Sequence, residues 1–123
     1  MSRFVLVVDD DQAIRETLCE MLTDEGHRAV GAANGREALA LLRSDGRPCL
    51  IFLDLMMPVM DGWAFRVEQR QDPNLRDIPV VVLSAAMNPA QEAARLGAIA
   101  GLGKPLDIAR LLNLVAQYCP RRS

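Results

Sequence analysis

The hydrophobic positions of the chain form short unbroken runs that are separated by longer periodic segments. Three runs, residues 4–8, 50–53 and 80–83, are continuously apolar, and the first two end directly in aspartate. Unbroken apolar runs of this length are typical of strands that are covered on both faces of a parallel sheet. Weaker strand patterns cover residues 27–33 and 99–103, where two glycines interrupt the last one. The pattern therefore predicts five strands.

A segment with helical spacing follows each predicted strand. The first has apolar residues at steps of three and four positions and ends at Gly26. A strand followed by a helix five times over predicts right-handed crossovers, a parallel sheet and helices on both faces. We therefore predict an α/β fold, a doubly wound (βα)5 sheet. The remaining helices are expected at residues 36–43, from Asp61 and Gly62 onward, at 90–96 and at 108–118.

Length and composition narrow the class of protein. A chain of 123 residues is the usual size of one domain, so we expect a single domain over residues 1–123 and no output domain. A net charge of -2 provides no positive field for nucleic acid or for a membrane surface. The longest apolar run is far below the roughly 20 residues of a membrane span. Because the first run stops at Asp9, it does not resemble a secretory signal, and we expect a cytoplasmic protein.

The three cysteines, Cys19, Cys49 and Cys119, are odd in number and lack the spacing of metal ligands. This pattern favours reduced and mostly buried thiols, as in cytoplasmic proteins, without a catalytic role. We expect the tail, residues 120–123, to be frayed.

Reactive side chains follow four of the predicted strands. Asp9 and Asp10 end the first strand, Asp54 the third, Ser84 the fourth and Lys104 the fifth. In an open α/β sheet, ligands bind beyond the carboxyl ends of the strands, where the strand order reverses. The five side chains are therefore expected at one site.

Three neighbouring carboxylates repel one another and raise the pKa of one member unless a cation lies between them. Oxygen ligands without histidine or thiolate favour magnesium, with manganese as the alternative, over zinc. Magnesium keeps coordination positions for phosphate oxygens, which indicates phosphoryl chemistry. Asp54 would then be the nucleophile, while Lys104 and Ser84 stabilise the charge that develops during transfer.

These motifs together resemble the response-regulator receiver family, and the resemblance covers the whole chain. No single motif is decisive, but their order and their places at strand ends are highly specific together. The motifs are Val7-Val8-Asp9-Asp10, Asp54-Leu55-Met56-Met57-Pro58 with Asp61-Gly62, Leu83-Ser84-Ala85, and Lys104-Pro105.

The resemblance implies a fold and a set of metal ligands. The expected fold is the flavodoxin-like sheet with strand order 2-1-3-4-5. Asp10 and Asp54 would bind magnesium directly, Asp9 would act through a bound water, and the backbone carbonyl of Met56 would complete the protein ligands. The resemblance also implies a cis peptide bond before Pro105, which proline makes far less costly than any other residue.

The resemblance further implies a regulatory domain and not an enzyme. A histidine kinase or a histidine phosphotransfer protein would phosphorylate Asp54 in a two-component system or phosphorelay. Phosphorylation would then change the binding of a downstream protein, with no direct contact to nucleic acid or membrane.

The chain departs from the family pattern at three positions. Gly101 stands where receivers commonly have an aromatic residue that turns inward as the hydroxyl residue moves. Because glycine has no ring, we hypothesise that residues 85–96 transmit the signal by an order-disorder change. Met56 and Ala86, which flank the phosphate in this family, are apolar and cannot orient an attacking water. We therefore expect intrinsic dephosphorylation that is not especially fast.

Two other classes of protein match part of this pattern. A small phosphatase of the haloacid dehalogenase type also has a nucleophilic aspartate, but it needs a second aspartate where Met56 stands. A receiver that binds partners without phosphorylation would not need Asp54, Ser84 and Lys104 together. Asp11 is interpreted as a helix cap and not as a further metal ligand.

Overall fold

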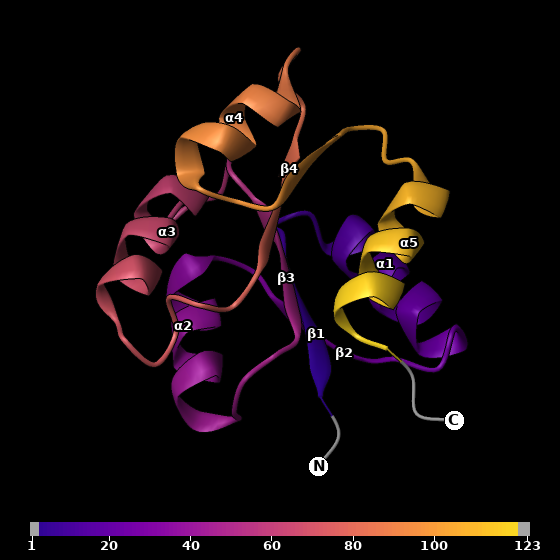
Figure 1. Ribbon diagram of the computed structural model, residues 1–123, viewed down its shortest axis with the longest axis horizontal. Coiled ribbons are helices and arrows are strands. Elements are labelled where there is room, and N and C mark those ends of the chain that lie inside the picture. The colour runs from indigo at the N-terminus through magenta and orange to yellow at the C-terminus, as the bar shows by residue number, and fades with distance from the viewer. Residues whose placement is uncertain (1–2, 121–123) are drawn as a thin grey trace.

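The five strands form one parallel sheet in the order β2-β1-β3-β4-β5 in the computed structural model, which describes residues 3–120 (Figure 1). This flavodoxin-like order is the one that the resemblance to the receiver family implied, and it reverses between β1 and β3. The expected fraying of the tail at residues 121–123 lies outside the described part. The strands are β1 (Phe4–Val8), β2 (Arg28–Ala32), β3 (Leu50–Asp54), β4 (Val80–Ser84) and β5 (Ala100–Gly103).

The helices cover both faces of the sheet. In Figure 1, α1 and α5 lie on one side of the strands, and α2, α3 and α4 lie on the other. The bounds differ from the predicted ones by one or two residues, as is usual at helix ends. None of the helices within the described residues is long and apolar enough to cross a membrane. The helices are α1 (Gln12–Asp24), α2 (Gly35–Ser44), α3 (Gly62–Gln71), α4 (Pro89–Leu96) and α5 (Ile108–Tyr118).

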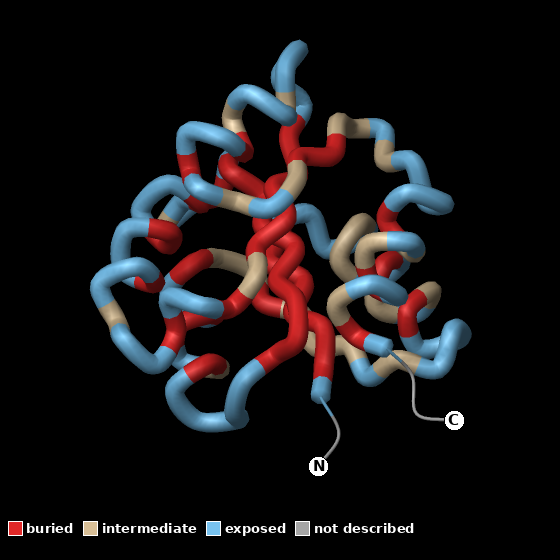
Figure 2. The backbone as a smooth tube through the Cα atoms, in the orientation of Figure 1, coloured by how far each residue is buried: buried red, intermediate tan, exposed pale blue. Residues whose placement is uncertain are grey.

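Two hydrophobic layers hold the sheet between the helices. Phe65 of α3 and Leu39 of α2 belong to the layer on one face, and Leu18 of α1 and Leu111 of α5 belong to the other. The central strands are buried along their whole length, as the red segments of Figure 2 show. This explains why their sequences are continuously apolar.

Asp11 and Gly62 fix where α1 and α3 begin at the carboxyl edge of the sheet. Asp11 accepts hydrogen bonds from the backbone N–H groups of Ala13 and Ile14, so its interpretation as a helix cap is confirmed. Gly62 starts α3 directly beside the end of β3, and a Cβ there would lie 2.6 Å from the carbonyl oxygen of Asp54. Only glycine permits this close approach, which ties the first turn of α3 to the strand that presents Asp54.

The prediction of three reduced thiols is wrong for two of them. Cys49 and Cys119 form a disulfide, with their Cα atoms 5.6 Å apart, whereas Cys19 is free and half-buried. The last turn of α5 returns to the beginning of β3, and this contact joins residues that are 70 positions apart in sequence. Local spacing does not reveal such a pair. The disulfide lies at the amino end of β3, away from the aspartates.

Candidate functional site

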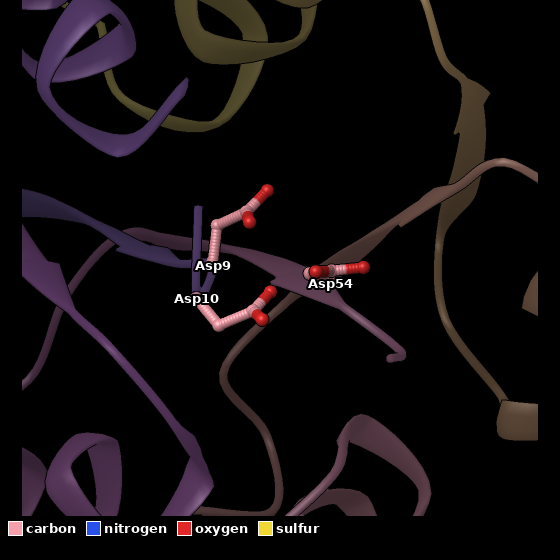
Figure 3. A group of neighbouring side chains, drawn as sticks. All are labelled: Asp9, Asp10 and Asp54. Atoms are coloured by element: carbon pink, nitrogen blue, oxygen red, sulfur yellow. The ribbon is translucent and has the colours of Figure 1, made fainter. Parts of the chain in front are cut away.

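Three carboxylates meet at the carboxyl ends of β1 and β3 (Figure 3). Asp9 and Asp10 follow β1 and Asp54 ends β3; parallel pairing of Val8 with Leu53 brings these ends side by side. One oxygen from each of the three side chains lies within 4.8 Å of the others. Asp9 and Asp54 are buried, whereas Asp10 is exposed. The geometry thus gathers the three aspartates that the sequence assigned to one site.

Lys104 places its ammonium group between two of these carboxylates. Its Nζ donates a hydrogen bond to Asp9 Oδ2 at 3.1 Å and lies 3.6 Å from Asp54 Oδ1. The backbone N–H of Lys104 donates to the carbonyl oxygen of Ser84, and the Lys104–Pro105 peptide bond is cis. The lysine is therefore held at the acidic cluster by the end of β5 and by its ion pairs.

Burial and charge shift the titration of this cluster. Burial, reinforced by the negative charge of Asp9, raises the pKa of Asp54 from 3.8 to about 6, although Lys104 opposes the shift. For Lys104, burial acts to lower the pKa, but the hydrogen bond and charge of Asp9 outweigh it, with help from Asp54, and the pKa is raised. The lysine thus stays charged near neutral pH, while Asp54 is held in an environment that disfavours its charge.

Backbone groups orient the two buried carboxylates. The N–H of Asp11 donates to Asp9 Oδ1, and the N–H of Met56 donates to Asp54 Oδ1 at 3.3 Å. Arg15 of α1 donates from Nη1 to the backbone carbonyl of Asp9 at 2.7 Å. Sequence reasoning missed Arg15, for which the only local signal is a basic residue one turn after the cap of the helix.

Ser84 also lies at this edge, but it faces α4. Its hydroxyl donates a hydrogen bond to Glu92 Oε1 at 2.6 Å, and its Oγ accepts one from the N–H of Ala86 at 3.0 Å. Ser84 is buried and Glu92 is half-buried. Glu92 was also missed, because an acidic residue in the first turn of a helix has the usual interpretation of a favourable charge at the helix start.

The first turn of α4 explains the glycine in β5. A Cβ on Gly101 would lie 2.2 Å from the carbonyl oxygen of Pro89 and 3.2 Å from the backbone nitrogen of Ala90. The backbone of α4 therefore occupies the space that a side chain at position 101 would need. The close approach of α4 to β5 therefore requires glycine at position 101 and leaves no room for an aromatic side chain.

Val59, in the loop between β3 and α3, adopts a strained backbone. Its φ is 70°, a left-handed conformation that β-branched residues rarely adopt, and its side chain is exposed. We expect Val59→Gly to raise the free energy of unfolding by about 1 kcal/mol, because glycine adopts this conformation without strain. Urea unfolding would measure the change. Val59→Asn should stabilise in the same direction, and destabilisation by both variants would contradict the expectation.

The donor set of the cluster fits a hard divalent cation. All three candidate side chains offer carboxylate oxygens, whereas Cys49 is engaged in the disulfide at the other end of β3 and His27 precedes β2. Such a set matches the preference of magnesium or manganese and does not match that of zinc. Magnesium is also the cation that the resemblance to receiver domains implies at this cluster.

Comparison with known proteins shows the family. Residues 5–116 match the response regulator receiver domain. The chain is 34% identical, over its full length, to sporulation initiation phosphotransferase F of Bacillus subtilis, covering 98% of that protein. It is 41% identical to response regulator MprA of Mycolicibacterium vanbaalenii over 88% of its own length, but it spans only 46% of MprA.

Solved structures agree with this assignment. Chemotaxis protein CheY4 of Vibrio cholerae is 33% identical and superposes with a TM-score of 0.84, covering 96% of this chain and 99% of that one. A response regulator receiver protein of Pseudomonas putida is 31% identical with a TM-score of 0.85, covering 95% and 98%. The chain belongs to the response regulator receiver domain family of two-component systems, which is regulatory and not a class of catalytic enzymes.

Proposed function

We propose that this receiver accepts a phosphoryl group on Asp54 from a histidine kinase or a histidine phosphotransfer protein, and that phosphorylation switches its binding to a partner protein. The observation that carries the proposal is the position of the Asp54 carboxylate, buried in an acidic cluster and 3.6 Å from the ammonium group of Lys104. The expected place of this exchange is the cytoplasm.

Each side chain of the site would have a separate role in phosphoryl transfer. An oxygen of Asp54 attacks the phosphorus of the phosphohistidine donor, so that a P–O bond forms while the P–N bond breaks and its electron pair returns to the histidine. The charge of Lys104 stabilises the phosphoryl oxygens, and the hydroxyl of Ser84 is the nearby donor that can turn toward them. Phosphoryl transfer needs mainly positioning and electrostatic stabilisation, which these groups supply.

A magnesium ion would be held by Asp10 and Asp54 directly, by Asp9 through water and by the backbone carbonyl of Met56. When bound, it would neutralise the clustered carboxylates and the incoming phosphoryl oxygens. The raised pKa of Asp54 supports this assignment, because a carboxylate beside other carboxylates gains most from a cation.

Incubation with acetyl phosphate and magnesium tests the proposal directly. Intact-mass spectrometry should show one phosphoryl group on the wild-type chain, stable in acid and labile in base, as an acyl phosphate is. Asp54→Asn should abolish the adduct, whereas Asp77→Asn, which changes an exposed carboxylate outside the site, should leave it in place.

The outcome separates the alternatives. A folded wild-type chain without an adduct would overturn the proposal in favour of a receiver that works without phosphorylation. Steady turnover of acetyl phosphate without a stable adduct would indicate a small phosphatase. That alternative is not favoured, because Met56 offers no second carboxylate two residues after Asp54.

The phosphoryl group on Asp54 should decay slowly. Met56 and Ala86 are exposed, and neither side chain can hold an attacking water by a hydrogen bond. We expect Met56→Asn and Ala86→Glu each to speed decay about fivefold, the equivalent of one hydrogen bond of about 1 kcal/mol. Loss of the adduct with time would be followed by mass spectrometry. Met87→Asn, in the same exposed loop as Ala86, is the control, and equal lifetimes in all four proteins would refute the expectation.

A further inference from the structure

The donor proton of the Ser84 hydroxyl is already engaged without a phosphoryl group. It donates to Glu92 Oε1 at 2.6 Å and accepts from the N–H of Ala86 at 3.0 Å. A serine hydroxyl carries one proton and can donate only one hydrogen bond at a time. The proton that would stabilise a phosphoryl oxygen is therefore already held by a carboxylate of α4.

We infer that Glu92 is a positioning residue that competes with the phosphoryl group for the proton of Ser84, so that phosphorylation releases the first turn of α4 from β4. The inference rests on the proposed phosphorylation of Asp54, and it identifies the contact through which phosphorylation would move α4.

The electrostatics of the site favour this release. When the hydroxyl turns away, the half-buried carboxylate of Glu92 loses its donor, and an unpaired charge in such a place is costly. The phosphoryl group also adds negative charge on the neighbouring strand, because Asp54 pairs with Leu83, the residue directly before Ser84. Both effects favour movement of Glu92 toward solvent.

The other end of α4 is fastened more firmly. Arg66, a buried residue of α3, donates from Nε to the carbonyl oxygen of Leu96 and from Nη2 to that of Gly97, both at 2.9 Å. Ala93 and Leu96 also pack in a small hydrophobic cluster under the helix. Released at one end and fixed at the other, α4 should pivot about its last turn.

Gly101 determines what a movement of α4 would change at β5. The first turn of α4 lies directly on β5 at this glycine, so no aromatic side chain lies there to relay a change. Displacement of the turn would uncover the strand itself. In this receiver the Ser84–Glu92 contact therefore takes the place of the aromatic relay.

Binding of beryllofluoride with magnesium, a mimic of the phosphoryl group, tests the inference. Glu92→Ala should bind the mimic about 10-fold more tightly than the wild type, because Ser84 no longer has to give up a charge-assisted hydrogen bond. Glu92→Gln keeps the acceptor without the charge and should show a smaller gain. Glu68→Ala, which removes an exposed carboxylate of α3, should bind as the wild type does.

A double-mutant cycle separates competition from a merely structural effect. In a Ser84→Ala background, Glu92→Ala should change the affinity for beryllofluoride by less than twofold, because the contested proton is gone. Hydrogen exchange of the backbone amides provides a second measurement. The mimic should speed exchange at residues 90–92 of the wild type, whereas residues 95–98 should stay protected.

Two of these results would overturn the inference, and a third would refute the proposed function. Equal affinity of the wild type, Glu92→Ala and Glu92→Gln would overturn the inference, and so would a gain that persists without Ser84. If the folded wild type bound no beryllofluoride with magnesium, the phosphorylation of Asp54 would be refuted first, and the inference with it.

Discussion

Gly101→Ala is expected to lower the free energy of unfolding by about 3 kcal/mol, although it adds only one methyl group. The added Cβ would lie 2.2 Å from the carbonyl oxygen of Pro89. That oxygen belongs to the backbone at the start of α4, so the clash can be relieved only by moving the helix or the strand. Restoring the family's aromatic residue with Gly101→Tyr should therefore destabilise the fold and not restore a relay.

The neighbouring glycine provides a matched control. A Cβ on Gly103 in the same strand would have its nearest contact at 3.5 Å, with the side chain of Pro89, which is an ordinary van der Waals distance. Gly103→Ala should therefore change the free energy of unfolding by less than about 1 kcal/mol. Urea unfolding of both variants would measure the difference, and equal stability of the two would contradict the close approach of α4 to β5.

Asp54→Asn is expected to stabilise the metal-free protein at neutral pH, although it removes the phosphoryl acceptor. Burial and the charge of Asp9 raise the pKa of Asp54 to about 6 in the fold, above the 3.8 of an unperturbed carboxyl. The folded chain therefore holds this proton more tightly than the unfolded chain does. Ionisation of Asp54 consequently costs about 1 to 3 kcal/mol of stability at pH 7.

The stabilisation expected for Asp54→Asn depends on pH. The favourable contribution of Asp54 is complete below about pH 4 and is lost as the pH rises through about 6. The wild type should thus lose stability relative to Asp54→Asn between these values, and magnesium should remove most of the difference. Unfolding by urea at several pH values, with Asp77→Asn as the control, would measure it. A constant difference across this range would show that the charge of Asp54 is not the cause.

Much of the site could be predicted from sequence because the geometry of a parallel sheet does most of the positioning. Apolar runs that end in Asp9 and Asp54 must place those residues at one edge once the strands are parallel. The pattern of the fifth strand is less regular, because Gly101 and Gly103 interrupt it. The structure explains Gly101 by the backbone of α4, a contact that no local pattern contains.

The contacts that sequence did not reveal all join elements through tertiary packing. The hydrogen bond from Ser84 to Glu92 depends on where α4 lies on the sheet, and Arg66 reaches the end of α4 from the neighbouring helix. Composition and spacing carry information about elements one at a time. The side chains that connect one element with the next, including those proposed to carry the signal, become visible only when the elements are packed.

The Cys49–Cys119 disulfide fastens the end of α5 to the beginning of β3, at the edge opposite the aspartates. A cross-link between residues 70 positions apart restricts the unfolded chain and so favours the folded one, but in the reducing cytoplasm, where the chain is expected to act, this bond would form only when the surroundings become oxidising. The resistance of the chain to heat and proteolysis would then depend on the ratio of thiols to disulfides in its environment. The proposed phosphorylation takes place at the opposite edge of the sheet. The lifetime of the folded protein would therefore depend on redox conditions, whereas its signalling activity would depend on the phosphoryl donor.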